Sequence, residues 1–279
     1  MELYYRKLDQ VSKSTKVSSQ SQGTGYPIII LHGLYGSSDN WLTIGKELSL
    51  DWEVYLVDLR NHGNSPHTDH HTYPLMNLDL LEFLDTRGIE KCILIGHSMG
   101  GKVAMAFAAE CAERIRSMVV VDIGPKSYHS LTGYSSQAID HLNILNAMQS
   151  VDFSRVMTRE EIDAQLEIYV KSERIRNFLM KSISRNRDNT FSWKINVPVL
   201  VKDLPAMLEG VGYTSKGITG FPILFIRGEN SDYISDDDIP GIKNLFPSAE
   251  FVTIPGAGHW VHSEKPELVV KTIRNFLNR

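Results

Sequence analysis

The chain has 279 residues, of which 42% are hydrophobic and 22% charged, and its formal net charge is −4. This composition is typical of one large α/β domain with an insertion, or of two ordinary domains. The weakly acidic balance argues against nucleic acid or an anionic membrane surface as a partner. Because the sequence contains no apolar stretch of membrane-spanning length and no signal-peptide core, we expect a cytoplasmic protein without membrane insertion.

The two cysteines, Cys92 and Cys111, lie in a predicted strand and at the end of a predicted helix. Neither belongs to a Cys-x-x-Cys pair, so we expect buried thiols rather than a disulfide or a metal site. The histidine-rich stretch 67–71 is a polar loop without a matching second group of ligands. We therefore predict no metal and no organic cofactor.

The first part of the chain alternates strands with helices. A short strand at 3–8 is followed by a polar, serine-rich stretch, 12–25, which is predicted to be an edge hairpin or a loop. Apolar runs typical of strands buried on both faces then alternate with segments of helical spacing. The strands are 27–31, 53–58, 92–95 and 117–122, and the helices are 38–48, 73–87 and 102–110. This alternation predicts a mostly parallel sheet with helices on both faces.

From residue 124 to 220 the pattern becomes mostly helical. The expected helices are 136–148, 158–170 with a Thr158/Glu161 capping box, 173–184, and 204–208 after a short apolar piece at 197–201. The sheet pattern resumes at 221–226 and 250–254, and an amphipathic helix at 264–277 ends the chain. We therefore predict a core formed by 1–123 and 221–279, with residues 124–220 inserted as a cap over the carboxyl ends of the strands.

One strand runs directly into a Gly-x-Ser-x-Gly turn, Gly96 to Gly100, and then into a helix of small residues. This order of strand, turn and helix is the context of a nucleophile elbow. The two glycines leave room for a sharp turn, and Ser98 is presented at the helix N-terminus, where the helix dipole favours developing negative charge. Ser98 is therefore the predicted nucleophile.

A serine hydroxyl needs a base to take its proton. Among the ten histidines, His259 follows the last predicted strand in a glycine-rich loop just before the final helix. The chain order serine, acid, histidine places the base there. The oxyanion of an acyl-transfer intermediate needs two N–H donors, and their positions predict the backbone amides of Met99 and Leu34.

Two carboxylates compete for the role of the acid that orients His259. The usual position after the penultimate strand is occupied by Ser231, and Asp232 stands one residue late. Asp122 ends the strand that follows the elbow helix, from which it could reach the same imidazole. Spacing alone leaves both candidates open.

These motifs together resemble the small bacterial YbfF-type esterases of the α/β-hydrolase superfamily and their mitochondrial relatives. The resemblance runs from residue 26 to the C-terminus and rests on the motifs at 31–37, 60–63, 96–102, 121–125, 230–231 and 256–262. It implies the α/β-hydrolase fold with a cap, and it assigns the nucleophile to Ser98, the base to His259, the acid to Asp122 and a helper hydroxyl to Ser231.

The expected function is a serine hydrolase that forms an acyl-enzyme on a small-molecule ester. Carboxylic esters are the leading substrate class, and acyl thioesters such as acyl-CoA are an open extension. A carbon–carbon bond hydrolase or lyase would use the same residues, and a non-catalytic receptor would use the same scaffold. Dehalogenases and epoxide hydrolases need an aspartate where Ser98 stands.

Two further groups of residues receive mainly structural interpretations. The turn 60–63 is predicted to be structural and to lie beside the pocket. The apolar cap residues are predicted to pack, with one or two lining the acyl pocket. They are Phe153, Tyr169, Phe178, Met180 and Trp193.

Overall fold

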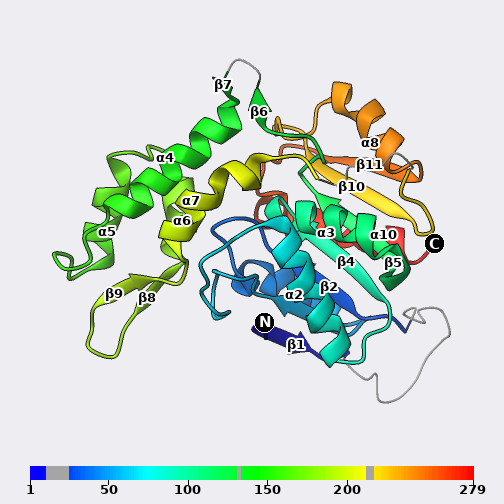
Figure 1. Cartoon of the computed structure of the whole chain (residues 1–279), viewed down its shortest axis with the longest axis horizontal. Helices are drawn as coiled ribbons and strands as arrows, with labels where there is room; N and C mark the ends of the chain where they lie inside the picture. Colours follow the sequence, from blue (N-terminus) through cyan, green and yellow to red (C-terminus); the bar gives the residue numbers. More distant parts are fainter. Residues whose placement is uncertain (11–24, 131–132, 212–216) are drawn as a thin grey trace.

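A seven-stranded sheet forms the centre of the molecule (Figure 1). The computed structural model describes residues 1–10, 25–130, 133–211 and 217–279, so the predicted loop at 12–25 lies almost wholly outside the described residues. In spatial order the strands are β1 (Tyr5–Leu8), β3 (Val54–Val57), β2 (Ile28–Leu31), β4 (Cys92–His97), β5 (Ile115–Val121), β10 (Ile223–Gly228) and β11 (Ala249–Ile254). Only β1 is antiparallel to its neighbour, so the prediction of a mostly parallel sheet is confirmed.

Each face of the sheet is covered by its own helices. Successive side chains of a strand point to opposite faces, so Ile29 and Leu31 of β2 enter one core while Ile28 and Ile30 enter the other. The first core is closed by α2 (Tyr73–Thr86), α3 (Met99–Glu110) and α8 (Ile239–Leu245), and the second by α1 (Leu42–Leu48) and α10 (Pro266–Leu277). This two-sided burial explains why the strands are continuous apolar runs.

The segment between β5 and β10 leaves the sheet and forms what we call the cap. Figure 1 shows it to one side of the sheet. Its elements are β6 (His129–Ser130), β7 (Gly133–Tyr134), α4 (Ser136–Ser150), α5 (Arg159–Glu167), α6 (Glu173–Met180), β8 (Ile183–Arg185), β9 (Phe191–Trp193) and α7 (Val197–Leu208). The predicted capping box is present, since the Thr158 hydroxyl accepts from the Glu161 amide and the Glu161 carboxylate accepts from the Thr158 amide.

Two details of the cap differ from the sequence prediction. The helix expected over 173–184 ends at Met180, and the next residues pair as the hairpin of β8 and β9, whose three-residue strands are too short to show an alternating pattern. The valine-rich piece 197–201 and the helix at 204–208 form one helix, α7. Helical spacing of its buried residues overrides the strand preference of its valines.

The remaining helical segments are short. They are η1 (Ser38–Trp41), η2 (Ala112–Arg114), η3 (Asp236–Asp238) and α9 (Val261–Glu264). The final helix, predicted at 264–277, is α10 and begins at Pro266, and the short α9 precedes it.

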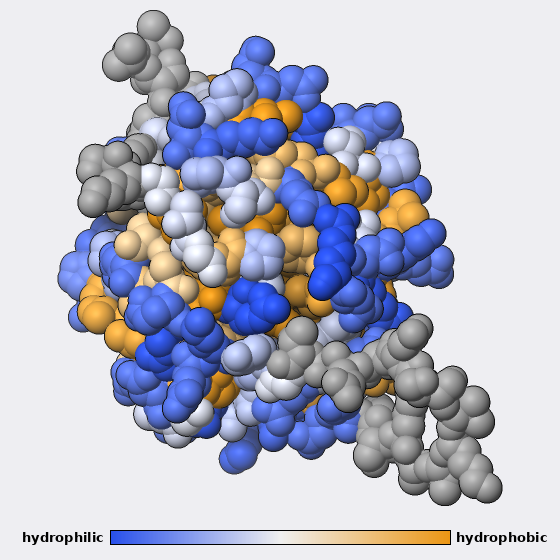
Figure 2. Space-filling model, turned by 90° about the vertical axis from the view of Figure 1, so that its right-hand side faces the viewer, coloured by the Kyte–Doolittle hydropathy of each residue, from blue (hydrophilic) through white to orange (hydrophobic). Residues whose placement is uncertain are grey.

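Figure 2 shows the side of the molecule that lies at the right of Figure 1, away from the cap. Hydrophilic residues, in blue, surround a central region of hydrophobic residues, in orange. Within the described ranges of the chain, the helices are all too short or too polar to cross a bilayer.

Candidate active site

The turn between β4 and α3 has the geometry of a nucleophile elbow. Ser98 has φ 52° and ψ −119°, a strained conformation for a residue with a side chain. A Cβ on Gly96 would lie 2.2 Å from the Gly100 carbonyl oxygen, and a Cβ on Gly100 would lie 2.4 Å from the Leu31 carbonyl oxygen. Both positions therefore require glycine.

The structure brings Ser98, His259 and Asp122 into one hydrogen-bonded chain. His259 Nε2 lies 3.0 Å from Ser98 Oγ, and His259 Nδ1 lies 2.8 Å from Asp122 Oδ2. Asp122 is fully buried, with φ 53°. The Gly228 amide donates to Asp122 Oδ1 at 2.8 Å, and the Ser231 hydroxyl donates to Asp122 Oδ2. Both carboxylate oxygens are thus held, and the carboxylate faces the imidazole in a fixed orientation.

The second candidate acid, Asp232, lies outside this chain of hydrogen bonds. Its side chain is exposed, and its backbone carbonyl accepts from Gln137 Nε2 at 3.5 Å. Of the two carboxylates, Asp122 is the one whose oxygen reaches His259 within the described residues. The displacement by one residue after β10 therefore places Ser231 beside the Asp122 carboxylate and turns Asp232 to the surface.

The two predicted oxyanion donors, the amides of Leu34 and Met99, belong to residues that line one pocket together with Ser98. Met99 is the first residue of α3, and the first amides of a helix have no acceptor within it. Neither amide has a hydrogen-bond acceptor within the part of the chain that the structure describes. A Cβ on Gly33 would lie 3.2 Å from Ser98 Cβ, so the loop that carries Leu34 passes directly against Ser98.

The chain matches the family model described as the alpha/beta hydrolase fold over residues 26–266. It belongs to the alpha/beta hydrolase family. Esterase YbfF of Escherichia coli (strain K12) is 38% identical over 261 residues, which cover 94% of this chain and 96% of that protein. The sn-1-specific diacylglycerol lipase ABHD11 of Xenopus laevis is 39% identical over 259 residues, which cover 91% and 80%. The solved structure "Marine microorganism esterase" is 41% identical, with a TM-score of 0.89 over 99% of both chains.

These findings confirm the predicted fold class and the resemblance to the YbfF-type esterases. Relatives named esterase and lipase match over more than nine-tenths of the chain, and this alpha/beta hydrolase is accordingly a carboxylic ester hydrolase. A structure titled "Crystal Structure of E-2-(Acetamidomethylene)succinate Hydrolase" has a TM-score of 0.75 but 21% identity, so it shows the shared fold alone.

Two pockets of this alpha/beta hydrolase meet at Ser98. The base-side cleft, of about 180 Å³, is lined by His259. The lysine-side pocket, of about 30 Å³, is lined by Lys102. Both are also lined by His141 and Tyr233, so these two side chains stand at the junction of the pockets together with Ser98.

Sequence reasoning did not identify Lys102, His141 or Tyr233. Lys102 had a signal, because it is a charge followed by seven apolar residues in α3, and Tyr233 directly follows the serine–aspartate pair at 231–232. His141 had none, since it is a single histidine in a helix of mixed polar and apolar residues and belongs to no motif. None of the five apolar cap residues that we expected to pack or line the acyl pocket is found in the lining of either pocket.

Three of those five side chains make aromatic contacts elsewhere in the described structure. Trp193 packs edge-on against Phe153 and donates from Nε1 to the Met148 carbonyl at 3.0 Å. Phe178 packs against the ring of Trp260. The residues of 124–220 that do reach the pockets come from α4, α6 and α7, together with Tyr128 just before β6.

Lys102 is a buried side chain one helical turn after Ser98. Its ammonium group donates to the backbone carbonyls of Leu208 and Glu209 and lies 4.8 Å from the centre of the Tyr128 ring. Burial lowers the pKa of Lys102 to about 7, although the charge of Glu209 acts in the opposite direction. A cation therefore borders the pocket at a pH below about 7, and the neutral amine does so above it.

We expect Lys102 to make the protein more stable as the pH rises from about 7 to about 10. Its pKa is lowered in the folded state from an ordinary value near 10.5, so the unfolded chain binds more protons in this window and the free energy of unfolding increases with pH. Denaturant unfolding across the window measures this, and Lys102→Met is the control because it lacks the titrating group. Identical pH slopes for the two proteins would contradict the assignment.

His97 fixes the loop that carries His259. Its Nε2–H donates to the His259 carbonyl oxygen at 2.9 Å. Burial, and then the charges of His262 and His259, hold the pKa of His97 well below its ordinary value. A neutral imidazole with its proton on Nε2 makes this bond, so His97 positions the backbone of His259 without adding charge to the site.

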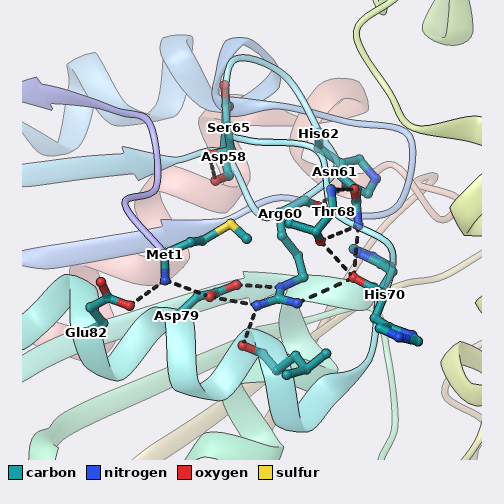
Figure 3. A network of polar contacts seen from close by, with 12 residues as sticks. Met1, Asp58, Arg60, Asn61, His62, Ser65, Thr68, His70, Asp79 and Glu82 are labelled. Atoms are coloured by element: carbon teal, nitrogen blue, oxygen red, sulfur yellow. Dashed lines mark hydrogen bonds and ion pairs between the residues drawn. The ribbon is translucent and has the colours of Figure 1, made fainter.

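The turn at 60–63 is built into the scaffold (Figure 3). Arg60 makes a paired contact with Asp79, with nitrogen–oxygen distances of 2.6 and 2.8 Å, in a buried environment. The Asn61 side chain bonds to the His70 carbonyl and the Thr68 amide. The Asn196 amide and side chain, just before α7, donate to Asn61. The turn therefore ties the start of α7 to the core, as expected of a structural turn.

The histidine-rich loop at 67–71 does not converge on one point. The His70 ring is exposed beside Lys202, whereas the His71 ring is buried with Nε2 3.2 Å from Met99 Sδ. Within the residues that the structure describes, no three His, Cys, Asp or Glu side chains are arranged to hold a metal ion.

Proposed function

We propose that this carboxylic ester hydrolase works through an acyl-enzyme on Ser98. The observation that carries the proposal is the hydrogen-bonded chain from Ser98 Oγ through His259 to Asp122. His259 Nε2 would accept the Oγ proton as Oγ attacks the ester carbonyl, while Asp122 stabilises the imidazolium through Nδ1–H. His259 then gives the proton to the departing alcohol, and water repeats the sequence to release the acid.

In this proposal, the amides of Leu34 and Met99 bind the oxyanion of each tetrahedral intermediate. Their lack of another acceptor in the described structure supports the assignment. Donors aimed at the developing charge are worth most when they are already in place, and each typically contributes roughly 100- to 1,000-fold in turnover.

The two pockets suggest where the alcohol and the acyl group of the substrate bind. The group that receives the proton from His259 is the leaving oxygen, and His259 lines the base-side cleft. We therefore place the alcohol in the base-side cleft and the acyl group in the lysine-side pocket. The lysine-side pocket is small, about 30 Å³, which favours short acyl chains. Because α4, α6 and α7 line these pockets, we propose that residues 124–220 act as a cap that sets substrate preference.

The charge of the base-side cleft favours neutral leaving groups. Asp140 and Asp232 both line it, and burial together with the charge of Asp232 raises the pKa of Asp140. Coenzyme A carries several negative charges, which two carboxylates would repel. We therefore expect oxygen esters of neutral alcohols to be hydrolysed in preference to acyl-CoA thioesters.

A substrate panel tests this proposal. It contains p-nitrophenyl acetate, butyrate and octanoate, acetyl-CoA and a diacylglycerol, the last because relatives are named diacylglycerol lipases. We expect the highest kcat/KM for the short p-nitrophenyl esters and slower turnover of the octanoate and of acetyl-CoA. A fluorophosphonate label, located by peptide mapping, should modify Ser98. Labelling of Ser98 without turnover of any ester would favour a binding protein instead.

A further inference from the structure

We propose that His141, on the cap helix α4, is a positioning residue that holds the base and the oxyanion loop in their working geometry through Tyr233 and Tyr35. This inference rests on the proposed function. His141 Nε2 lies 3.3 Å from the Tyr233 hydroxyl, and His141 Nδ1 lies 3.2 Å from the Tyr35 hydroxyl. One imidazole from the cap therefore joins two tyrosines of the core.

Tyr233 supports the base directly. Its ring stacks on the His259 imidazole with centres 3.8 Å apart and an angle of 16° between the planes. The backbone carbonyl of Tyr233 accepts from the Tyr128 hydroxyl at 3.0 Å, so the main chain at this tyrosine is also held. A ring that lies flat against the base restricts the plane in which the imidazole can sit. The hydroxyl at the far end of that ring is the one that His141 binds.

Tyr35 connects the same histidine to the oxyanion loop. It follows Leu34 in sequence and has φ 66°, within a turn in which the Gly36 amide donates to the Gly33 carbonyl at 3.0 Å. Its carbonyl accepts from the hydroxyl of Ser182, a cap residue, at 2.7 Å. Tyr35 is thus held by the cap at both its hydroxyl and its backbone, and its position sets the direction of the neighbouring Leu34 amide.

The chemistry of a neutral imidazole suits this double contact. Burial, and then the charges of His259 and Lys102, lower the pKa of His141 to about 4, so the ring is neutral at neutral pH. A neutral imidazole has one donor and one acceptor nitrogen. One tyrosine hydroxyl therefore donates to it and the other accepts from it. An apolar side chain of similar size can make neither bond.

His141 also lines both pockets, beside the nucleophile. Loss of its two side-chain hydrogen bonds would release the hydroxyl of the Tyr233 ring and loosen the base. Tyr35 would keep the bond from its hydroxyl to the His141 carbonyl, at 3.4 Å, and the Ser182 contact at its backbone, so the oxyanion loop would be weakened less. Removal of such a supporting contact typically costs roughly 10- to 100-fold in activity. The loss should fall on kcat, because the tyrosines act on the reacting groups rather than on substrate affinity.

The test uses the full-length protein and p-nitrophenyl acetate. We expect His141→Leu to lower kcat by roughly 10- to 100-fold with little change in KM. His141→Gln keeps one donor and one acceptor, and it should restore most of the loss. The acid limb of the plot of kcat/KM against pH reports the titration of the catalytic base in the free enzyme. The midpoint of this limb should shift along the pH axis in His141→Leu but not in His141→Gln. Gln137→Leu, one turn earlier on α4 and also lining a pocket, is the matched control and should leave that limb in place.

A double-mutant cycle separates positioning from a general loss of structure. In a Tyr233→Phe background, His141→Leu should cost less than it does alone, because one of its two partners is already absent. Additive losses in the cycle, or a kcat and acid limb for His141→Leu equal to those of the wild type, would overturn the inference. Failure of the wild-type protein to hydrolyse any ester would instead overturn the proposed function.

Discussion

Replacing Ser98 by alanine is expected to reduce ester turnover by roughly 10⁴- to 10⁶-fold while the protein remains folded. Alanine keeps the Cβ that already occupies the strained position at φ 52°, so the backbone of the elbow gains no new clash. The contact that disappears is the 3.0 Å bond from Oγ to His259 Nε2, and with it the nucleophile. Residual activity would come from the oxyanion amides and from substrate binding.

Initial rates with p-nitrophenyl acetate and a thermal melt of both proteins measure this effect. Ser231→Ala is the matched control, because it also removes one serine hydroxyl from the site, but that hydroxyl donates to the Asp122 carboxylate and makes no hydrogen bond to His259 in the described structure. We expect about a tenfold loss for that variant. Turnover that survives Ser98→Ala unchanged would eliminate the acyl-enzyme mechanism.

Asp122→Asn is expected to lower kcat by about 10⁴-fold with the site geometry preserved. The Gly228 amide can still donate to the side-chain oxygen of the asparagine. The other end then presents an NH₂ group to His259 Nδ1, which must accept a hydrogen bond and lose its proton. The proton moves to Nε2, so the imidazole can no longer accept the hydrogen of Ser98. The base is present in the wrong tautomer.

The comparison variant is Asp232→Asn, which removes a surface carboxylate beside the same loop. It should leave the kcat for a neutral ester unchanged. Steady-state kinetics of the two asparagine variants at neutral pH distinguish the candidate acids. A large loss confined to Asp232→Asn would reverse our assignment.

Most of the fold could be predicted because the two-sided sheet leaves a strong signal. Strands such as β2 and β4 are buried on both faces and are therefore uninterrupted apolar runs. The pairing of β8 with β9 could not be predicted, since three-residue strands carry too little pattern. The helix α7 was also missed in part, because its valines favour a strand in isolation while burial of one helical face decides the outcome.

The residues of the candidate site also differ in how clearly the sequence indicates them. Ser98 and His259 stand in turns whose glycines mark them in the sequence, and the structure brings the two together. The acid could not be chosen from spacing, because Asp122 and Asp232 both follow strands that end at the same edge of the sheet. The roles that we propose for His141 and Tyr233 depend on a contact between the cap and the core. The two residues are 92 positions apart in the sequence, and no local pattern encodes such a contact.

Tyr35, Ser98 and Asp122 share one property that concerns the cost of the site to the protein. All three are non-glycine residues with positive φ, at 66°, 52° and 53°, and all three lie at the active site. Such a conformation costs roughly 1–2 kcal/mol for each residue. The two buried cores must supply this free energy before any substrate arrives. The surrounding structure therefore holds these three residues in backbone conformations that are unfavourable locally. Substitutions that let the turns adopt lower-energy conformations would make the protein more stable and a less active catalyst.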